Sequence, residues 1–317
     1  MTAPSRNLIW ETEDGVSTEP RLTRPVVYGL LAFSVTVLGM NWPVMVTALK
    51  SITPIWLAAF RVAGAAVFAL ILTASTGKLA PPVRRDMPMM VVLTVFRLCA
   101  VMVLVFFALK LVPAGRASVL VWTSSLWTVP IAAVFLGERM SRPKWLGVGV
   151  GIAGVIVISQ IWGNDWSDRD VIVGTTLLLL AALVSSATTV FIRRHQWKID
   201  PLEALPWQFL GGTALLVTLA LLVEGAPDVD WSAQLVLIIL YQAVPASGLA
   251  FWAQILVLRN LSAVSMNLTM MGVPVLGVLS SAVFLDESIT AGLTLGIALV
   301  FCGVAVNLLS DDRTDRI

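Results

Sequence analysis

Residues 134–157 read VFLGERMSRPKWLGVGVGIAGVIV, and residues 283–306 read VFLDESITAGLTLGIALVFCGVAV. The two stretches align without a gap at an offset of 149 residues. Apolar matches are common in an apolar chain, but glutamate and glycine matches in one frame are not. The informative pairs are Glu138 with Glu287, Gly147 with Gly296, and Gly154 with Gly303. The chain therefore contains an internal repeat, which fixes its overall organisation.

The composition around this repeat excludes several classes of protein. Of the 317 residues, 58% are hydrophobic and 13% are charged, and the mean hydropathy is +0.89. A soluble domain carries about a quarter charged residues, and a disordered chain is far less apolar. The net charge of +2 argues against a nucleic-acid partner. Two cysteines and one histidine, Cys99, Cys302 and His195, offer neither a disulfide framework nor a metal site of His ligands.

Ten long apolar runs organise the chain. A bilayer core of about 30 Å takes roughly 20 apolar residues as a helix, and the runs lack the period of two that barrel strands show. Two runs are each interrupted by one arginine, Arg61 or Arg97. The sequence therefore predicts an all-α integral membrane protein with ten transmembrane helices. The runs are 26–49, 51–77, 87–109, 117–137, 145–164, 171–192, 204–223, 231–258, 260–285 and 288–310.

The charges between the runs predict the orientation in the membrane. With ten spans, fifteen Lys and Arg residues lie on the side of the two termini, and four lie on the other side. Cytoplasmic loops carry the excess of positive charge. We therefore expect a multi-pass protein of the plasma (inner) membrane, with residues 1–24 and 311–317 as cytoplasmic tails.

The repeat predicts two bundles of opposite orientation. Each repeat, 25–162 and 170–310, holds five helices, so the second must be inverted relative to the first. The loop of the first repeat with Arg139, Arg142 and Lys144 corresponds to residues 286–290, which hold no cation. Equivalent loops thus carry charges suited to opposite sides of the membrane. Two inverted five-helix repeats are typical of secondary transporters, whose site lies near the midplane.

Several motifs resemble those of one transporter family. They include GMNWPVMVTALK (39–50), FFALKLVPAG (106–115) and VLRNLSAVSMNLTMMGVPVLG (257–277), besides the repeated stretch. Together they resemble the ten-helix, EamA-type branch of the drug/metabolite transporter (DMT) superfamily. The resemblance implies a carrier of a small organic solute, not an enzyme, and it is shared with exporters of amino acids, including aromatic ones. Substrates vary widely in this family, so the resemblance leaves the solute open.

Two arginines within the spans are candidate functional residues. Burying an arginine near the middle of a membrane costs roughly 2.5–3.5 kcal/mol on insertion scales, so Arg97 is expected to face the bundle interior or a wet cavity. It either draws in an anionic group, such as a substrate carboxylate, or caps the carbonyls of a broken helix. Arg61 lies about two turns from the outer face, where a structural or gating role is favoured.

Two equivalent helices carry a mixed polar and bulky stripe. Ser118, Trp122 and Ser125 share one helix face. The 149-residue offset maps them onto Asn267, Met271 and Pro274, and Met270 precedes Met271 in the sequence. The stripes either line a central cavity, where adaptable methionines suit varied substrates, or simply fill the interior.

Further polar and aromatic residues lie deep in other spans. Pro43 removes a helix hydrogen bond, and the freed carbonyl, together with Asn41 and Trp42, either binds solute or only marks a kink. Gln208 is a candidate gating residue or a polar contact between helices. The span 231–258 contributes Tyr241, Gln242 and Trp252 as possible substrate contacts.

Small residues predict a scaffold in the fifth and tenth spans. Gly147 and Gly151, and Gly292 and Gly296, have the spacing that lets helices approach closely. We expect these helices outside the cavity, packed within one chain or at a homodimer contact. The protein is therefore expected to be a monomer or a homodimer.

The spans also restrict the mechanism. No Asp or Glu lies at mid-depth in any of them, which argues against a carboxylate proton relay. The sequence lacks the usual phosphate-loop and catalytic motifs, so no cofactor and no enzymatic reaction are expected. We predict export of a small metabolite, most simply a neutral or aromatic amino acid, by alternating access with facilitated diffusion or exchange. The alternative is an ion-coupled exporter of drugs or of other metabolites.

Overall fold

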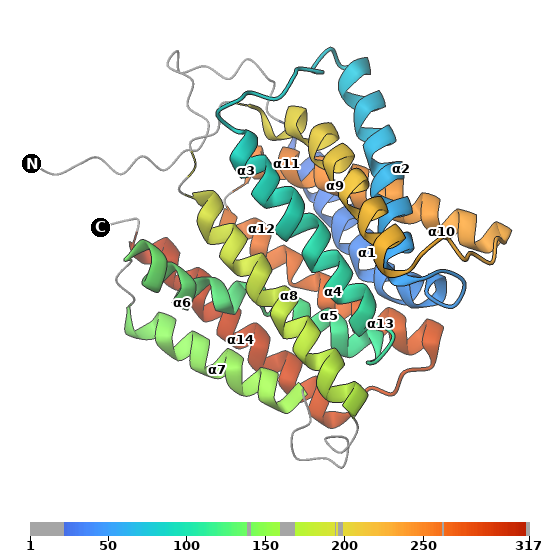
Figure 1. Cartoon of the computed structure of the whole chain (residues 1–317). Coiled ribbons are helices and arrows are strands. Elements are labelled where there is room, and N and C mark those ends of the chain that lie inside the picture. Colours follow the sequence, from blue (N-terminus) through green and yellow to red (C-terminus); the bar gives the residue numbers. More distant parts are fainter. Residues whose placement is uncertain are drawn as a thin grey trace, which may run out of the picture.

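The regular structure of the described residues is helical (Figure 1). The computed structural model describes residues 22–137, 141–158, 169–193, 195, 199–261 and 263–314. Two segments are π-helices, named η1 and η3. The elements are α1 Arg24–Ala48, α2 Pro54–Ser75, α3 Met87–Val92, η1 Leu93–Ala100, α4 Val101–Ala108, α5 Ala114–Trp122, α6 Ser124–Leu136, α7 Arg142–Ile158, α8 Arg169–Arg193, α9 Pro201–Val223, α10 Ala233–Ala243, η3 Val244–Leu249, α11 Ala250–Asn260, α12 Ala263–Met270, α13 Gly272–Leu285 and α14 Ala291–Thr314.

Within the described part of the chain, nine helical stretches are long and apolar enough to cross a membrane. They coincide with nine of the ten expected spans. The remaining expected span, the fifth at 145–164, contains α7, whose described residues end at Ile158. The all-helical membrane fold expected from the sequence is therefore confirmed. The nine stretches are 24–48, 54–75, 87–108, 114–136, 169–192, 201–223, 233–258, 265–285 and 291–309.

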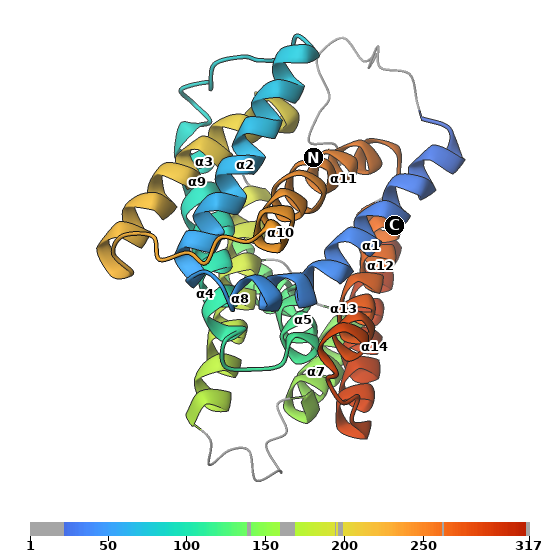
Figure 2. The same ribbon diagram turned by 90° about the vertical axis from the view of Figure 1, so that its right-hand side faces the viewer.

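Two helix pairs occupy opposite ends of the bundle. In Figure 1 the green α7 and the red α14 lie side by side at the lower left, and the light-blue α2 and golden α9 lie together at the upper right. Figure 2 shows the same separation after a quarter turn. Among the helices that lie between these pairs in Figure 1 are α5 and α8.

The α7–α14 pair is held by backbone contact at glycines. A Cβ on Gly147 would lie 2.7 Å from the Gly303 carbonyl oxygen, and one on Gly154 would lie 2.8 Å from that of Gly296. The two helices are antiparallel, because Gly154 follows Gly147 in α7, whereas its partner Gly296 precedes Gly303 in α14. Only glycine allows so close an approach. The glycine contacts expected from the sequence are thus made within one chain, except at Gly292, which meets no neighbouring element.

Equivalent glycines also lie where α2 contacts α10 and where α9 contacts η1. A Cβ on Gly64 of α2 would lie 2.6 Å from Cβ of Ala243 in α10, and one on Gly211 of α9 would lie 3.6 Å from Cγ2 of Thr94 in η1. Gly64 aligns with Gly211 at an offset of 147 residues, and Thr94 aligns with Ala243 at an offset of 149. The two halves of the chain therefore make corresponding contacts.

The helices next to the centre are interrupted at corresponding places. The fourth span breaks between α5 and α6 at Thr123, and the ninth breaks between α12 and α13 at Met271. At both breaks an amide bonds three residues back, from Thr123 to Leu120 and from Met271 to Leu268. The π-helices η1 and η3 also occupy overlapping positions under the 149-residue offset. Such interruptions occur often at functional sites and in transporters.

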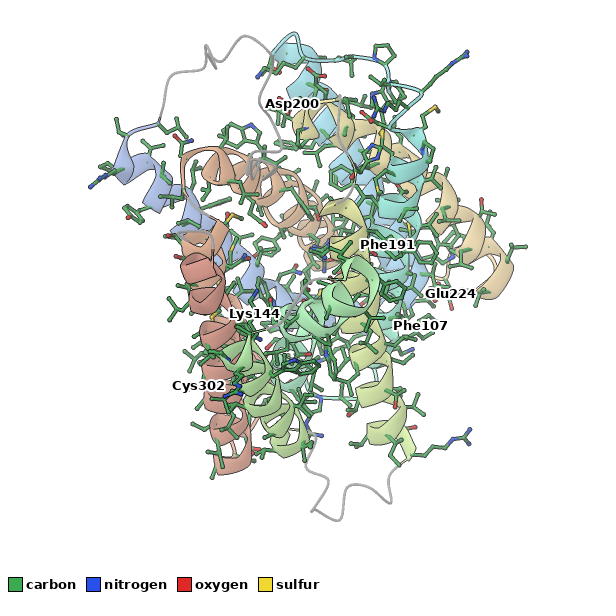
Figure 3. All side chains as sticks on the ribbon, turned by 90° about the vertical axis from the view of Figure 1, so that its left-hand side faces the viewer. Phe107, Lys144, Phe191, Asp200, Glu224 and Cys302 are labelled. Atoms are coloured by element: carbon green, nitrogen blue, oxygen red, sulfur yellow. The ribbon has the colours of Figure 1, made fainter. Side chains whose placement is uncertain are left out.

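Glutamates join the halves at one end of the helices. Glu224, which follows α9, accepts hydrogen bonds from the backbone N–H groups of Ile55 and Trp56 at 3.0 and 3.1 Å; Figure 3 labels it at the opposite end of α9 from Asp200. Glu287 accepts from those of Ala114 and Gly115 at 2.7 and 2.8 Å. Both carboxylates satisfy helix N-termini and favour the dipole there. Glu138, the counterpart of Glu287, lies outside the described residues.

Candidate functional site

The two predicted stripes meet at one pocket. In this conformation it is almost closed, with a cavity volume of about 10 Å³, roughly the space that one water molecule takes. Trp122 and Ser125 lie on one side, next to the break after α5, and their repeat equivalents Met271 and Pro274 lie on the other. The structure thus brings equivalent residues of the two halves to one place. The full lining is Trp122, Ser125, Asn267, Met271, Pro274, Val300, Phe301 and Val304.

The lining combines an apolar wall with a few polar groups. The indole of Trp122 and the thioether of Met271 offer adaptable apolar surface, and Ser125 and Asn267 offer hydrogen-bonding groups. Such walls are typical of small-molecule sites. Three residues of the wall, Val300, Phe301 and Val304, come from α14. The expectation that the tenth span lies entirely outside the cavity is therefore wrong, because α14 turns one face to α7 and another to the pocket.

Ser118 lies outside this pocket, at the junction of α1, α5 and α13. Its side chain is fully buried, and its hydroxyl donates to the carbonyl of Gly115 at 2.7 Å and to that of Pro274 at 3.3 Å. A Cβ on Gly277 would lie 2.8 Å from Ser118 and 3.0 Å from Trp42. Ser118 and Trp42 therefore pack against one glycine and, in this conformation, join the two halves rather than line open space.

Arg97 lies within the bundle on η1, and its side chain is exposed. Its Nη1 donates to Oγ and the carbonyl oxygen of Ser185 at 2.5 and 3.3 Å, and to Oγ1 of Thr189 at 3.1 Å. Ser185 and Thr189 are one turn apart on α8. Among the described residues its Nε and Nη2 make no hydrogen bond, so one side of the guanidinium stays available. Arg97 thus bonds a backbone carbonyl, but α8 is continuous at Ser185 and is not a broken helix; an anion-binding role for Arg97 stays a prediction.

Arg61 occupies a closed environment between α1, α2 and η3. Its side chain is only 7% exposed. Nε donates to Oγ of Ser247 at 2.9 Å, and Nη1 contacts Sδ of Met45 at 3.6 Å. Across the same interface the Tyr241 hydroxyl donates to the Val37 carbonyl at 2.7 Å. Both partners of Arg61 are neutral, so the charge of Arg61 is not balanced by them.

Asn41 and Gln242 are buried and have polar atoms without a partner among the described residues. Asn41 is 4% exposed and Gln242 is 0% exposed. Within the part of the chain that the structure describes, Asn41 Oδ1 and both polar atoms of the Gln242 amide have no hydrogen-bond partner. The carbonyl freed by Pro43, that of Gly39, instead accepts from the Ser280 hydroxyl at 3.3 Å. Of the two expected solute-binding groups in α1, the backbone carbonyl is therefore satisfied by protein and the Asn41 oxygen is not.

The other sequence candidates lie elsewhere. Met270 is buried in an apolar cluster with Val27, Leu31 and Val257. Trp252 is half-buried and packs against the main core. Gln208 is half-buried on α9, beside Trp207, whose indole N–H donates to the Ala80 carbonyl at 2.7 Å. The structure therefore brings only some of the candidates together at the pocket, and it leaves Ser118, Trp42 and Arg97 outside the pocket lining together with these three.

Sequence reasoning missed the partners of both arginines. Ser185 and Thr189, which hold Arg97, and Ser247 and Met45, which hold Arg61, were not singled out. A signal existed for the first pair, because two hydroxyl residues at helical spacing in an apolar span form a polar spot on one face. For Ser247 there was none, because η3 changes the direction of its side chains. No cluster of three potential metal ligands occurs within the described part of the chain.

Comparison with known proteins identifies the family. The model of the EamA-like transporter family matches residues 26–160 and again residues 172–309. The uncharacterized transporter YoaV of Bacillus subtilis is 26% identical over 292 residues, covering 91% of this chain and 98% of that protein. A probable amino-acid metabolite efflux pump of Salmonella typhimurium is 28% identical, covering 64% of this chain and 70% of that protein.

Two further similarities extend this comparison. A probable terminal-alkyne amino-acid exporter of Streptantibioticus cattleyicolor is 28% identical over 224 residues, covering 70% of this chain and 73% of that protein. A solved crystal structure superposes with a TM-score of 0.65 at 21% identity, covering 92% of this chain and all of the other. This likeness supports the fold, and the names of the relatives point to transport.

Proposed function

The chain belongs to the EamA-like transporter family of the drug/metabolite transporter superfamily, and we propose that it is a secondary carrier that exports a neutral or aromatic amino acid. The observation that carries this proposal is the pocket between the two interrupted helices. There, Trp122 and Ser125 of one half face Met271 and Pro274 of the other. A site shared by two related halves can open to either side when the halves move against each other.

The proposal includes ten spans in two inverted repeats, 25–162 and 170–310. The antiparallel packing of α7 and α14 supports it, because equivalent helices of an inverted pair run in opposite directions. Gly147 contacts Gly303, which is the repeat equivalent of Gly154. Gly154 in turn contacts Gly296, which is the repeat equivalent of Gly147. The matched contacts of Gly64 and Gly211 agree with the same symmetry.

We place the carrier in the plasma membrane with both termini in the cytoplasm. The excess of Lys and Arg in the loops on the side of the termini supports this orientation. Loops carrying Glu224 and Glu287 then face outward, where these carboxylates join the two halves. Inward opening leaves these contacts in place, whereas outward opening must break them.

An amino acid is the substrate class that the chemistry supports best. The pocket offers apolar surface with two polar side chains, and the exposed Arg97 offers a cation to a carboxylate. Two relatives are named for amino acids or their metabolites. A cationic drug would meet Arg61 and Arg97 and no carboxylate at mid-depth in the expected spans. We therefore favour transport driven by the substrate gradient or by exchange.

Counterflow in proteoliposomes tests this function. Purified full-length protein is reconstituted with an unlabelled amino acid inside, and uptake of the labelled amino acid is followed with equal pH on both sides. We expect uptake that neutral and aromatic amino acids inhibit and that nucleosides, sugars and cationic dyes do not. Uptake that appears only with an imposed proton gradient would overturn the mechanism. Inhibition by dyes alone would favour the multidrug alternative.

A further inference from the structure

Arg61 is a buried cation without a carboxylate partner among the described residues. Its contacts are the Ser247 hydroxyl and the Met45 sulfur. The elements that carry Arg61 and its two partners, α1, α2 and η3, contain no Asp or Glu. A buried charge is costly unless it is paired, and a hydroxyl and a thioether supply only weak compensation. The site is therefore short of negative charge.

Helix geometry places Asn41 on the side of α1 that faces Arg61. Asn41 lies one turn from Val37, whose carbonyl accepts from Tyr241, and one turn from Met45, whose sulfur contacts Arg61. Residues at this spacing share a helix face. The buried and unpaired Asn41 Oδ1 therefore lies between two contacts that join α1 to α2 and α10.

Gln242 points into the same region. Its neighbour Tyr241 contacts α1, and its other neighbour Ala243 abuts Gly64 of α2. Successive side chains on a helix differ in direction by about 100°, so Gln242 is directed between α1 and α2. Both polar atoms of its amide are buried and unpaired. Arg61, Asn41 and Gln242 are therefore directed toward the same interface, that of α1, α2 and α10.

We propose that Arg61, Asn41 and Gln242 form an occluded site for the zwitterionic head group of an α-amino acid. This inference rests on the proposed amino-acid transport and deepens it. The forked guanidinium of Arg61 and the Gln242 amide N–H donate to the carboxylate. The oxygens of Asn41 and Gln242 accept from the ammonium group. The zwitterion satisfies every unpaired group noted here, whereas a lone amine leaves Arg61 unpaired and a lone carboxylate leaves the two oxygens unpaired.

The test uses ligands that differ only in the head group. L-phenylalanine is compared with 2-phenylethylamine, which lacks the carboxylate, and with 3-phenylpropionate, which lacks the ammonium. L-leucine, isoamylamine and 4-methylpentanoate form a second set. Inhibition of counterflow and the ligand-induced rise in melting temperature report on binding to the full chain. We expect at least one amino acid to bind the wild type at least about tenfold more tightly than both of its analogues.

Two substitutions separate the two parts of the head group. Arg61→Gln is expected to remove the preference for phenylalanine over the amine and to keep its preference over 3-phenylpropionate. Asn41→Leu removes the unpaired buried oxygen that accepts from the ammonium group and removes no donor assigned to the carboxylate, so it is expected to weaken the preference over 3-phenylpropionate while keeping the preference over the amine. Arg61→Lys keeps the charge without the fork and should retain part of the first preference. Ser75→Ala, at the exposed end of α2, is the matched control and should change nothing.

The possible outcomes distinguish this inference from the proposed function. If the wild type transports amino acids and Arg61→Gln keeps both preferences, the head group binds elsewhere and the inference is wrong, while the function stands. If the wild type binds 3-phenylpropionate as tightly as phenylalanine, the site takes simple anions, which also overturns the zwitterion assignment. If neither amino acid of the two sets binds the wild type, the inference falls, and failure of every neutral amino acid in counterflow removes the function too.

Discussion

The two arginines within the spans differ in their surroundings. Arg61 is 7% exposed and bonds one hydroxyl and one sulfur, whereas Arg97 is exposed and bonds three oxygens of α8. Each is associated with a π-helix: Arg97 lies on η1, and Arg61 contacts Ser247 of η3. The two π-helices occupy corresponding positions in the two halves. Both arginines belong to the first half of the chain, but Arg97 lies on the π-helix of that half, whereas Arg61 contacts the π-helix of the other half.

This difference indicates that one type of residue can have two roles in a membrane. An exposed guanidinium keeps its hydration and attracts anions at a distance. A buried guanidinium has lost that hydration and gains most from a partner in direct contact. We therefore expect Arg97 to affect the rate at which substrate arrives and Arg61 to affect which substrate is held.

The largest effect is expected from Arg61→Met. Methionine keeps much of the volume and removes the unbalanced charge, so amino-acid counterflow should fall at least about a hundredfold. Replacing a buried charge by an apolar residue is often neutral or stabilising, by about 1–4 kcal/mol, so the melting temperature without ligand should not fall. Counterflow and thermal unfolding in detergent measure the two effects. A clear fall in melting temperature would show that Arg61 is mainly structural.

A smaller effect is expected from Arg97→Gln. Loss of the exposed charge should lower the initial rate of counterflow about tenfold at low ionic strength, because long-range attraction of the carboxylate is lost. The difference from the wild type should shrink as salt is added, since salt screens exposed charges. Arg97→Lys, which keeps the charge, should retain most of the rate. Equal losses at all salt concentrations would contradict an attracting role.

The smallest effect is expected from Ser185→Ala. Arg97 Nη1 loses one of its three oxygen partners and keeps Thr189 Oγ1 and the backbone carbonyl. The rate should therefore change by no more than about threefold, the scale of one hydrogen bond to an accessible group. Thr176→Ala, at an exposed site on the same helix, controls for general effects on α8. A loss as large as that in Arg97→Gln would mean that the orientation of Arg97 matters more than its charge.

Much of the fold could be predicted from the sequence. Nine expected spans coincide with described helices, and the glycines of the fifth and tenth spans form the contact of α7 with α14. The offset of 149 residues also anticipated which residues meet, because Trp122 and Ser125 share a pocket with Met271 and Pro274. The spans follow from the hydropathy of consecutive residues, and the equivalent positions follow from the repeat, so both can be read from the residue order.

The local geometry of one helix end could be predicted only in part. Asp286 stands where the first repeat has Gly137, and both residues adopt the left-handed conformation, with φ of 55° and 67°. Aspartate tolerates this conformation better than most residues, so the helix ends at the same place with a different side chain. The repeat thus preserves the backbone where the sequence departs from it.

The sequence by itself determined the helical membrane fold, the duplication and the family, because the bilayer requires long apolar helices and the repeat is written in the residue order. Only the tertiary structure decided which polar groups meet. Ser118 is used to join two helices, Arg61 is closed in with Ser247, and Asn41 and Gln242 stay unpaired. Those partnerships depend on how interrupted and π-helical segments rotate side chains where helices cross, which hydropathy along the chain does not encode.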